Sequence, residues 1–554
     1  MRRAFQPLLF GVLALMAACG GVSDDEIHAA LAAELADSAP PEFAGRSAWE
    51  VTRGIYEDAG GAPIWLDGGK PSKRARELVD AIAGAEDQGL RTAEYDLAGL
   101  GDALRRAYKD EGSEPAELAE VDLRLTSLYV EHGRHLLAGR FDPARISDGW
   151  FIRTRLAAVD SAIRSRATGD VADAFAGFLP RTPDYQVLMD ARSRYAAIAE
   201  AGGFPEVGGT AEPGDSGAVV AAIVKRLVME GDLDSAASAI RTYDSTVARA
   251  VAHFRNRFGI EPGSTVDRAT LAAMKVPAAE RVRQVELNLE RLRWLPESFG
   301  DRYVAVNIPD FLLRAYDGGK EVMTMRVIVG DEYDGSTPVF ADTMTLAVFR
   351  PYWNVPSGIA RDEILPLVQQ NASYLERNEY EVVPANGSTP VDPRSIDWED
   401  LDSTNFPYAI RQKPGDRNAL GLVKFLFPNR FDIYMHDTPA DHLFHRHKRA
   451  LSHGCIRLEH PDRFAEFALD GTGDGWTPER IREAMHGEEN REVKLGRPVP
   501  VYILYLTAFA RDGRVHFRPD LYGADKRGME RLGRPPSTEQ IAALRSTLDE
   551  LLEG

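Results

Sequence analysis

Apolar residues in the first third of the chain recur with the spacing of amphipathic helices. In DDEIHAALAAELAD (24–37) and AEVDLRLTSLYVEHGRHLLAGRF (119–141) they fall at i, i+3, i+4 and i+7, which collects them on one face of a helix. No arrangement of residues with catalytic potential occurs in this region. The pattern predicts a helical scaffold domain over residues 20–205.

A second helical region follows a stretch rich in Gly and Pro at 201–217, which we interpret as a linker. Its longest predicted helix ends at Gly259 and carries one apolar stripe, formed by Val247, Val251, Phe254 and Phe258. The order of short helix, turn, longer helix and a final VDRATL sequence over 213–277 resembles the small three-helix peptidoglycan-binding domain. A generic helical bundle is the alternative. RVRQVELNLERLRWLP (281–296) predicts a connecting helix within 278–300.

From about residue 302 the hydrophobic period changes to two. Strands are predicted for YVAVNI, FLLRAY, EVMTMRVIVG, TMTLAVF, VKFLF, DIYMH and VPVYILYLTAF, with helical patches at 360–378 and 461–469. This indicates a mostly-β domain over 301–510 and a C-terminal tail over 511–554.

The segment 370–422 is rich in Asn, Pro, Asp and Ser and has little strand character. It is too long for an ordinary loop, and we therefore expect a capping insertion there. The predicted fold class is multi-domain α+β: a helical scaffold, a small three-helix module and a mostly-β domain with a cap.

Composition narrows the possible functions. The chain has 554 residues, too many for a single core, so several domains are expected. Its formal net charge of −19 makes nucleic acid a poor partner. A positively charged ligand or an acceptor amine is easier to accommodate.

The first nineteen residues have the pattern of an export signal, with Arg2 and Arg3 ahead of the short apolar run PLLFGVLALMAA. The run ends in LMAACG, which resembles a bacterial lipobox and implies that Cys19 is the lipidated first residue of the mature chain. Gly20 resembles the residue that follows in lipoproteins sent to the outer membrane. Simple cleavage after a small residue is the alternative. We expect a periplasmic protein that meets a membrane only through a lipid on Cys19.

The chain contains two cysteines, and a lipidated Cys19 leaves Cys455 without a disulfide partner. In an oxidising compartment an unpaired thiol is a liability unless its chemistry is used. The polar, turn-like sequence LSHGCIRLEH (451–460) fits a buried structural cysteine poorly. We therefore predict that Cys455 is a reactive nucleophile.

A thiol attacks as the thiolate and needs a base. His436 ends the DIYMH segment, and a strand end holds a base rigidly. His453 lies two residues before Cys455 in a turn, and the sequence does not determine the direction of its side chain. The other histidines nearby are interpreted as solvated loop residues rather than zinc ligands, because no second cysteine or carboxylate set accompanies them; they are His442, His445 and His447. No metal is expected.

Negative charge that develops on an attacked carbonyl oxygen needs hydrogen-bond donors. The backbone amides around Gly454 and Cys455 are the natural donors, since glycine lets the main chain approach closely. Arg457 could steady this loop, meet a substrate carboxylate or be an ordinary surface charge, and composition does not distinguish these readings.

The HDTP sequence that begins at His436, followed by SHGCIR at 452–457, resembles the catalytic signature of the L,D-transpeptidases, the YkuD-like catalytic domain. Further blocks are similar to the large, multi-domain murein L,D-transpeptidases: PYWNVPSGIARDEILP, IRQKPGDRNALGLVKFLFPN and PVPVYILYLTAF. In that subgroup a helical scaffold, a peptidoglycan-binding module and a capped catalytic domain follow one another, as predicted here. The resemblance covers roughly 210–525.

The resemblance implies roles for individual residues. Cys455 would be the nucleophile and His436 its base, while His453 and Gly454, with Cys455, would shape the oxyanion site. Substrate-binding roles are implied for Arg457, Tyr434, Trp353 and Ser452.

The implied substrate is a peptidoglycan tetrapeptide stem. The thiolate attacks the carbonyl between diaminopimelate and the terminal D-alanine, D-alanine leaves, and a thioester remains. An amine of a second stem then resolves the thioester into a 3→3 cross-link, whereas water gives carboxypeptidase activity. No cofactor is needed, because a thiol, an imidazole and amides suffice. The resemblance also implies that carbapenems acylate Cys455, and that the protein serves cell-wall biogenesis and cell shape.

Two other classes stay open. A Cys–His peptidoglycan endopeptidase would also be exported and thiol-dependent, but such families generally place the cysteine before the histidine, whereas His436 precedes Cys455. A non-catalytic lipoprotein would tether the wall through the 213–277 module alone. The acyl acceptor is also open: another stem, a lipoprotein lysine or a free D-amino acid.

Overall fold

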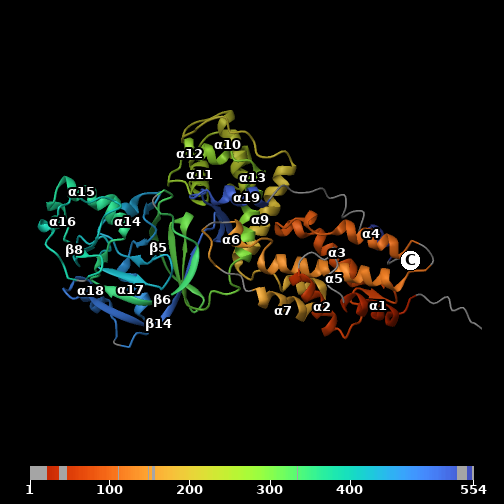
Figure 1. The fold of residues 1–554 in the computed structure, drawn as a ribbon. Coiled ribbons are helices and arrows are strands. Elements are labelled where there is room, and N and C mark those ends of the chain that lie inside the picture. Colours follow the sequence, from red (N-terminus) through yellow and green to blue (C-terminus); the bar gives the residue numbers. More distant parts are fainter. Residues whose placement is uncertain are drawn as a thin grey trace, which may run out of the picture.

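The structure is a computed structural model that describes residues 22–36, 46–109, 112–146, 149–152, 156–333, 335–387, 389–473, 475–532 and 546–551. The predicted export signal and Cys19 lie outside these residues. Helices fill one end of the molecule, a large β-sheet fills the other end, and a smaller group of helices lies above the junction (Figure 1).

The scaffold is helical, as predicted. Its elements are α1 (Asp24–Ala36), α2 (Arg46–Asp58), the short hairpin β1 (Leu66–Asp67) and β2 (Lys70–Pro71), α3 (Lys73–Ala83), α4 (Leu97–Ala107), α5 (Pro115–Ala138), α6 (Pro143–Ile146), α7 (Leu156–Arg166), α8 (Val171–Ala176) and α9 (Pro183–Glu200). Helix α5 lies at the centre, where the fully buried Asp122 accepts hydrogen bonds from Tyr56 Oη at 2.6 Å and the Trp65 amide at 2.8 Å. Residues 546–551 return to this core, in which Leu548 is fully buried.

The second helical group contains α10 (Ala218–Glu230), α11 (Ser245–Arg257) and α12 (Arg268–Met274). The stripe predicted on α11 is buried, and Gly259 has a φ of 59°, the left-handed conformation that glycine adopts without strain. Asp244 and Asp267 cap the N-termini of α11 and α12 with their side chains. The 201–217 stretch folds back on this group through a bridge between Ala211 and Val266.

Helix α13 (Ala278–Arg293) lies between the other parts and is buried on nearly every side. Its charged residues reach into each neighbour. Glu286 pairs with Arg91 of the scaffold at 2.7 Å, and Arg291 pairs with Asp525 of α19 (Ala524–Leu532) at 2.6 Å. The predicted connecting helix is therefore a structural centre of the molecule.

The main sheet has nine strands among the described residues, in the order β12 (Ala450–Ser452), β5 (Lys320–Gly330), β13 (Ile456–Leu458), β11 (Met435–His436), β10 (Val423–Leu426), β6 (Phe340–Phe349), β14 (Arg491–Leu504), β3 (Tyr303–Asn307) and β4 (Leu312–Asp317). An additional pairing of β4 with β5 closes the sheet on itself. Helices α17 (Pro461–Leu469) and α18 (Pro478–His486) flank it, and Phe464 packs edge-on against Phe425 at 4.8 Å between ring centroids.

Three of the predicted elements differ from the structure. In the DIYMH segment only Met435 and His436 are in a strand, because Asp432 has a φ of 55° and the Asn429 side chain accepts from the amides of Phe431 and Ile433. These contacts hold 429–433 as a loop.

The segment 370–422 contains more strand than predicted. Strands β8 (Tyr380–Pro384) and β9 (Tyr408–Gln412) join β7 (Trp353–Asn354) in a separate sheet. With α14 (Ser357–Ile359), a π-turn at Ala360–Ile364, α15 (Leu365–Gln370) and α16 (Ser373–Arg377), they enclose an apolar cluster of their own around Val382 and Ile410. The region thus has a small core, which its polar composition concealed.

The region from 511, predicted as a tail, contains ordered elements. Strands β15 (Ala508–Arg511) and β16 (Arg514–Phe517) form a hairpin through Asp512 and Gly513, both at positive φ, and an Asp-Gly turn is a strong hairpin signal. Arg257 donates to the Val515 carbonyl at 2.8 Å, so the hairpin packs against the second helical group.

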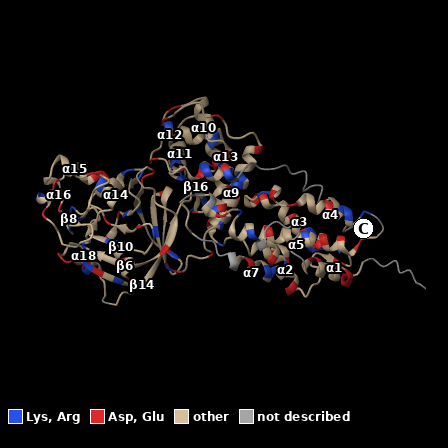
Figure 2. Ribbon diagram, viewed as in Figure 1, with Lys and Arg blue, Asp and Glu red and all other residues tan. Residues whose placement is uncertain are grey.

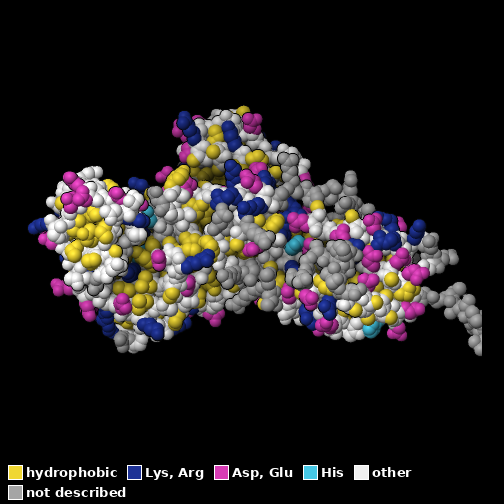
Figure 3. Space-filling model, viewed as in Figure 1, with side chains coloured by type: hydrophobic (Ala, Val, Ile, Leu, Met, Phe, Trp, Pro, Cys, Tyr) yellow, Lys and Arg dark blue, Asp and Glu magenta, His cyan; other side chains and the backbone are white. Residues whose placement is uncertain are grey.

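Charge is interspersed rather than segregated: acidic and basic residues alternate along the scaffold helices (Figure 2). The space-filling view shows hydrophobic side chains gathered over the central strands and more charged side chains over the scaffold (Figure 3). Among the described residues, no helix combines the length and the apolar character that crossing a bilayer requires.

Candidate active site

Strands β11 and β13 bring two distant segments together. They pair in parallel, with Met435 opposite Ile456 and His436 opposite Arg457. Paired residues share a face of the sheet and successive residues alternate between faces. Met435 and Ile456 point into the core and are fully buried, and His436 and Arg457 share the opposite face.

The same register extends the shared face by two residues. Tyr434 lies two positions before His436, and Cys455 lies two positions before Arg457, so all four side chains gather on one face. The Ile456 amide donates to the Tyr434 carbonyl at 3.1 Å, which continues the pairing to Cys455. The ring centroids of Tyr434 and His436 are 5.6 Å apart.

Cys455 is a free, half-buried cysteine in the turn between β12 and β13. Its Sγ lies 3.7 Å from the Asp432 carbonyl, which accepts its hydrogen bond. Burial raises the pKa of the Cys455 thiol to about 11, while hydrogen bonds from the Tyr434 amide and hydroxyl and the charge of Arg457 act to lower the pKa. The resting sulfur is therefore a thiol at neutral pH.

His436 is buried and neutral. Burial lowers the pKa of its ring to about 3, and the nearby positive charges of Arg457 and Lys424 contribute in the same direction. The Nδ1 atom lies 2.5 Å from the Asp437 carbonyl. A carbonyl can only accept, so Nδ1 carries the proton and Nε2 keeps its lone pair.

The turn that carries Cys455 is held by its own polar groups. Ser452 Oγ donates to the Cys455 carbonyl at 2.6 Å and accepts from the Gly454 amide at 3.2 Å. Gly454 has a φ of 116°, and a Cβ there would lie 3.0 Å from the Ile433 side chain. Glycine is required at this position both for its conformation and for the close approach.

Thr337 and Tyr522, which the sequence analysis did not single out, hold this turn in place through hydrogen bonds. Thr337, almost fully buried, donates from Oγ1 to the Gly454 carbonyl at 2.7 Å and accepts from the Gly330 amide at 2.9 Å. Tyr522 donates to the Gly330 carbonyl at 2.6 Å. A single Thr and a Tyr in the predicted tail carry no pattern that would reveal this role.

Residues 353–412, which contain most of the predicted insertion 370–422 together with β7 and the π-turn before it, contact the same turn and are hereafter called the insertion. His453 pairs through Nε2 with Glu363 of the π-turn at 2.9 Å, and both side chains are exposed. A hydrogen bond from Trp353 of β7 acts on the Tyr434 hydroxyl, whose pKa is raised chiefly by burial. The structure thus places Trp353 beside the group of four and directs His453 toward the insertion.

Two cations lie on or beside this face. Burial lowers the pKa of Arg457, and its Nε is buried with no hydrogen-bond partner among the described residues. Lys424 of β10 pairs in register with His436, and its Nζ lies 5.7 Å from the centre of the Tyr434 ring. The alternating pattern of VKFLF predicted that Lys424 lies in a strand, but it did not indicate that this residue pairs with His436.

The remaining histidines of this region lie apart from the four. Residues 441–445 form a short 3₁₀ turn in which His442 and His445 are exposed, and His447 is exposed in the loop that follows. Among the described residues, no group of three or more His, Cys, Asp or Glu side chains has the arrangement of a metal site.

Comparison with known families identifies two parts of the chain. The family model of the L,D-transpeptidase catalytic domain matches residues 301–501. Residues 301–501 are an L,D-transpeptidase catalytic domain. A scaffold-domain family model matches residues 50–191, within the helical end of the molecule.

A protein of Haemophilus influenzae named "Putative L,D-transpeptidase" is 36% identical over 244 residues. The matched region covers 44% of this chain and 48% of that protein, so the chain spans about half the length of its curated relative. A solved L,D-transpeptidase structure from Xylanimonas cellulosilytica has 14% sequence identity and a TM-score of 0.16, covering 53% of this chain and 96% of that one. That score adds nothing to the assignment of the L,D-transpeptidase domain.

Proposed function

We propose that the protein is a peptidoglycan L,D-transpeptidase in which Cys455 is the nucleophile and His436 the base. The observation that carries this proposal is the parallel register of β11 and β13, which puts the Cys455 thiol and a neutral imidazole on one face. The L,D-transpeptidase domain and its curated relative support the reaction class.

The acyl transfer follows from the protonation states. Before the reaction the Cys455 thiol carries its proton and the His436 imidazole is neutral. His436 Nε2 therefore takes the Sγ proton as sulfur attacks the carbonyl between diaminopimelate and D-alanine. The carbon–nitrogen bond then breaks, the imidazolium returns the proton to the departing D-alanine amine, and a thioester remains. An acceptor amine attacks the thioester and loses a proton to Nε2. The carbon–sulfur bond breaks, and the thiol regains the proton.

The oxyanion donor can be narrowed to one amide of the turn. The Gly454 amide already donates to Ser452 Oγ, so the Cys455 amide is the group we assign to the developing negative charge. The unpartnered Nε of Arg457 is suited to a stem carboxylate. His453 then shapes the rim of the site through its pair with Glu363 rather than acting as the base.

Three further assignments belong to the same proposal. The insertion is a cap, since Trp353 and Glu363 approach the turn of Cys455 from one side. The group formed by α10, α11 and α12 is a peptidoglycan-binding module. The protein is an exported lipoprotein of the periplasm, attached to the outer membrane through Cys19.

Replacement of the nucleophile or the base tests the proposal directly. Incubation of the protein with disaccharide-tetrapeptide, followed by mass spectrometry, should give a cross-linked dimer that has lost one D-alanine. Cys455→Ala should abolish D-alanine release. His436→Ala should reduce release at least about a hundredfold, the usual contribution of a positioned base. His445→Ala, at an exposed position of the 441–445 turn, is the matched control.

The outcomes separate the alternatives. A trimmed monomer without dimer would indicate an L,D-carboxypeptidase, and cleavage within existing cross-links would indicate an endopeptidase. Retention of wall attachment by Cys455→Ala, with no D-alanine release by the unaltered protein, would favour the non-catalytic tether.

A further inference from the structure

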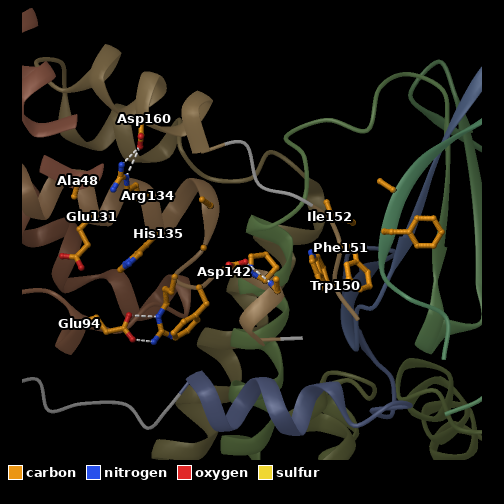
Figure 4. Close-up of a pocket in the computed structure, with 18 of the residues that line it drawn as sticks. Ala48, Glu94, Glu131, Arg134, His135, Asp142, Trp150, Phe151, Ile152 and Asp160 are labelled. Atoms are coloured by element: carbon orange, nitrogen blue, oxygen red, sulfur yellow. Dashed lines mark hydrogen bonds and ion pairs between the residues drawn. The ribbon is translucent and has the colours of Figure 1, made fainter. Parts of the chain in front are cut away.

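A large cavity lies between the scaffold and the L,D-transpeptidase domain. It has a volume of about 1100 Å³ and is hereafter the scaffold cleft. One wall comes from α5 and the turn that follows it, and the other from the start of β6 and the loop 429–431 (Figure 4). Pockets for drug-sized ligands occupy about 300–1,000 Å³, so this cleft can hold a larger molecule.

Most charges in the scaffold cleft are paired with one another. Arg134 pairs with Asp160 at 2.7 Å (Figure 4). Arg124 pairs with Asp96 at 2.8 Å, and Arg140 forms a bidentate pair with Glu94. On the scaffold wall these three guanidinium groups already bind carboxylates of the protein.

Arg430 on the opposite wall is different. Its guanidinium stacks on Phe151 and Phe431, with 4.4 and 4.9 Å to the two ring centroids. The side chain is exposed, and among the described residues its contacts are with these two rings and no carboxylate pairs with it. A stacked guanidinium is held in place with its donors free, which suits it to bind a carboxylate in a planar, bidentate manner.

Aromatic rings surround this cation. Phe151 and Phe431 are half-buried and lie 4.6 Å apart between centroids, and Phe141 also lines the cleft. Figure 4 shows Trp150, Phe151 and Ile152 in an extended segment along this wall. Partly exposed aromatic faces offer apolar contact to the C–H faces of sugar rings, beside polar groups that can hydrogen-bond to hydroxyls.

The scaffold cleft and the reactive sulfur lie on two sides of one loop. Phe431 and Asn429 line the cleft, and the next residue, Asp432, accepts the hydrogen bond of Cys455 Sγ at 3.7 Å. Consecutive Cα atoms are about 3.8 Å apart, so the cleft wall at Phe431 lies within a few residues' width of the thiol. Asn429 fixes the loop by accepting from the amides of Phe431 and Ile433 at 3.0 and 3.2 Å.

We propose that the scaffold cleft binds the acyl acceptor, a second peptidoglycan strand, with Arg430 holding a stem carboxylate and the aromatic rings contacting the sugars. This inference rests on the proposed function and selects among the acceptors left open by the sequence. The cap approaches Cys455 from the Trp353 side, whereas the cleft lies behind the loop that carries Phe431, so donor and acceptor would approach the sulfur from different sides. A free D-amino acid is far too small to span the cleft.

The test measures acceptor use by the full chain. With disaccharide-tetrapeptide as donor and disaccharide-tripeptide as acceptor, Arg430→Ala should raise the acceptor KM about tenfold and lower the ratio of cross-linked dimer to hydrolysed product. Phe151→Ala should act in the same direction, and Arg430→Lys, which keeps the charge but not the fork, should recover part of the loss. The matched control is Arg480→Ala, since Arg480 stacks on Trp476 at 5.3 Å outside the cleft.

An acceptor KM in Arg430→Ala within twofold of the Arg480→Ala value would overturn the assignment. If the unaltered protein releases no D-alanine, the proposed function fails by itself. Titration of disaccharide-tripeptide into Cys455→Ala protein then decides the cleft separately. Weaker binding after the added Arg430→Ala change supports the cleft, and equal binding overturns it.

Discussion

At the scale of single residues, the site combines a thiol that resists ionisation with an imidazole that resists protonation. Both effects arise first from burial, which disfavours the charged form of either group. A sulfur of this kind is protected from adventitious oxidation and reacts when a bound acyl donor and the base act together.

The raised pKa of the thiol predicts its alkylation profile. With a pKa of about 11 rather than 9.0, Cys455 holds about 100-fold less thiolate at pH 8 than an unperturbed cysteine, since each pKa unit is a factor of ten. The rate of iodoacetamide labelling at Cys455, followed by mass spectrometry, should keep rising from pH 8 to pH 10.5. A plateau near pH 9 would contradict the burial argument.

Tyr434 provides the companion experiment. Its hydrogen bonds act to lower the pKa of the thiol, so Tyr434→Phe should shift the labelling profile to higher pH and slow labelling at pH 9 several-fold. Tyr374→Phe is the control, because Tyr374 stacks on Tyr380 within the insertion. Equal rates for the two variants would exclude the Tyr434 hydroxyl from this role.

At the scale of elements, the position of the thiol depends on a hydroxyl between two turns. Thr337 bridges the Gly330 amide and the Gly454 carbonyl, and Thr337→Val keeps the shape but leaves both groups unpaired. The expected loss of unfolding free energy is about 1–3 kcal/mol, with at least a tenfold fall in D-alanine release because the turn shifts. Thr343→Val, at an exposed strand position, is the control; equal denaturant midpoints and rates for the two variants would refute this role.

The same element scale shows how far sequence patterns reach. The period-two pattern predicted most strands, and the helical spacing of apolar residues predicted the buried α11 stripe, because each of these elements has one face toward the core. The period-two pattern extended the DIYMH strand too far, since the positive φ of Asp432 and the Asn429 hydrogen bonds leave no periodic trace. Thr337, Lys424 and Tyr522 were missed because each acts through contacts with distant segments, and the scaffold cleft was missed because its walls are separated by hundreds of residues.

At the scale of the whole molecule, buried charges join the parts. Arg257 of α11 pairs with Glu230 and Asp232, whose side chains are fully buried, and also donates to the β16 backbone. Arg257→Ala would remove one partner from each buried carboxylate and leave Glu230 with Arg226 and Asp232 with His253, at a cost of about 1–3 kcal/mol. Urea denaturation should show this loss, whereas the exposed Arg249→Ala should change stability by less than about 0.5 kcal/mol. Similar urea midpoints for the two variants would mean that water replaces the contacts of Arg257 and that this residue does not stabilise the junction.

Residues 546–551 contribute Leu548 to the scaffold core, and Asp549 pairs there with Arg76. The scaffold core is therefore completed by a segment that is translated after the L,D-transpeptidase domain, so Leu548 and Asp549 can join it only once that domain has emerged from the ribosome. A nascent chain interrupted before this point would present an unfinished scaffold to chaperones and proteases, so its assembly reports that synthesis has passed beyond the catalytic domain.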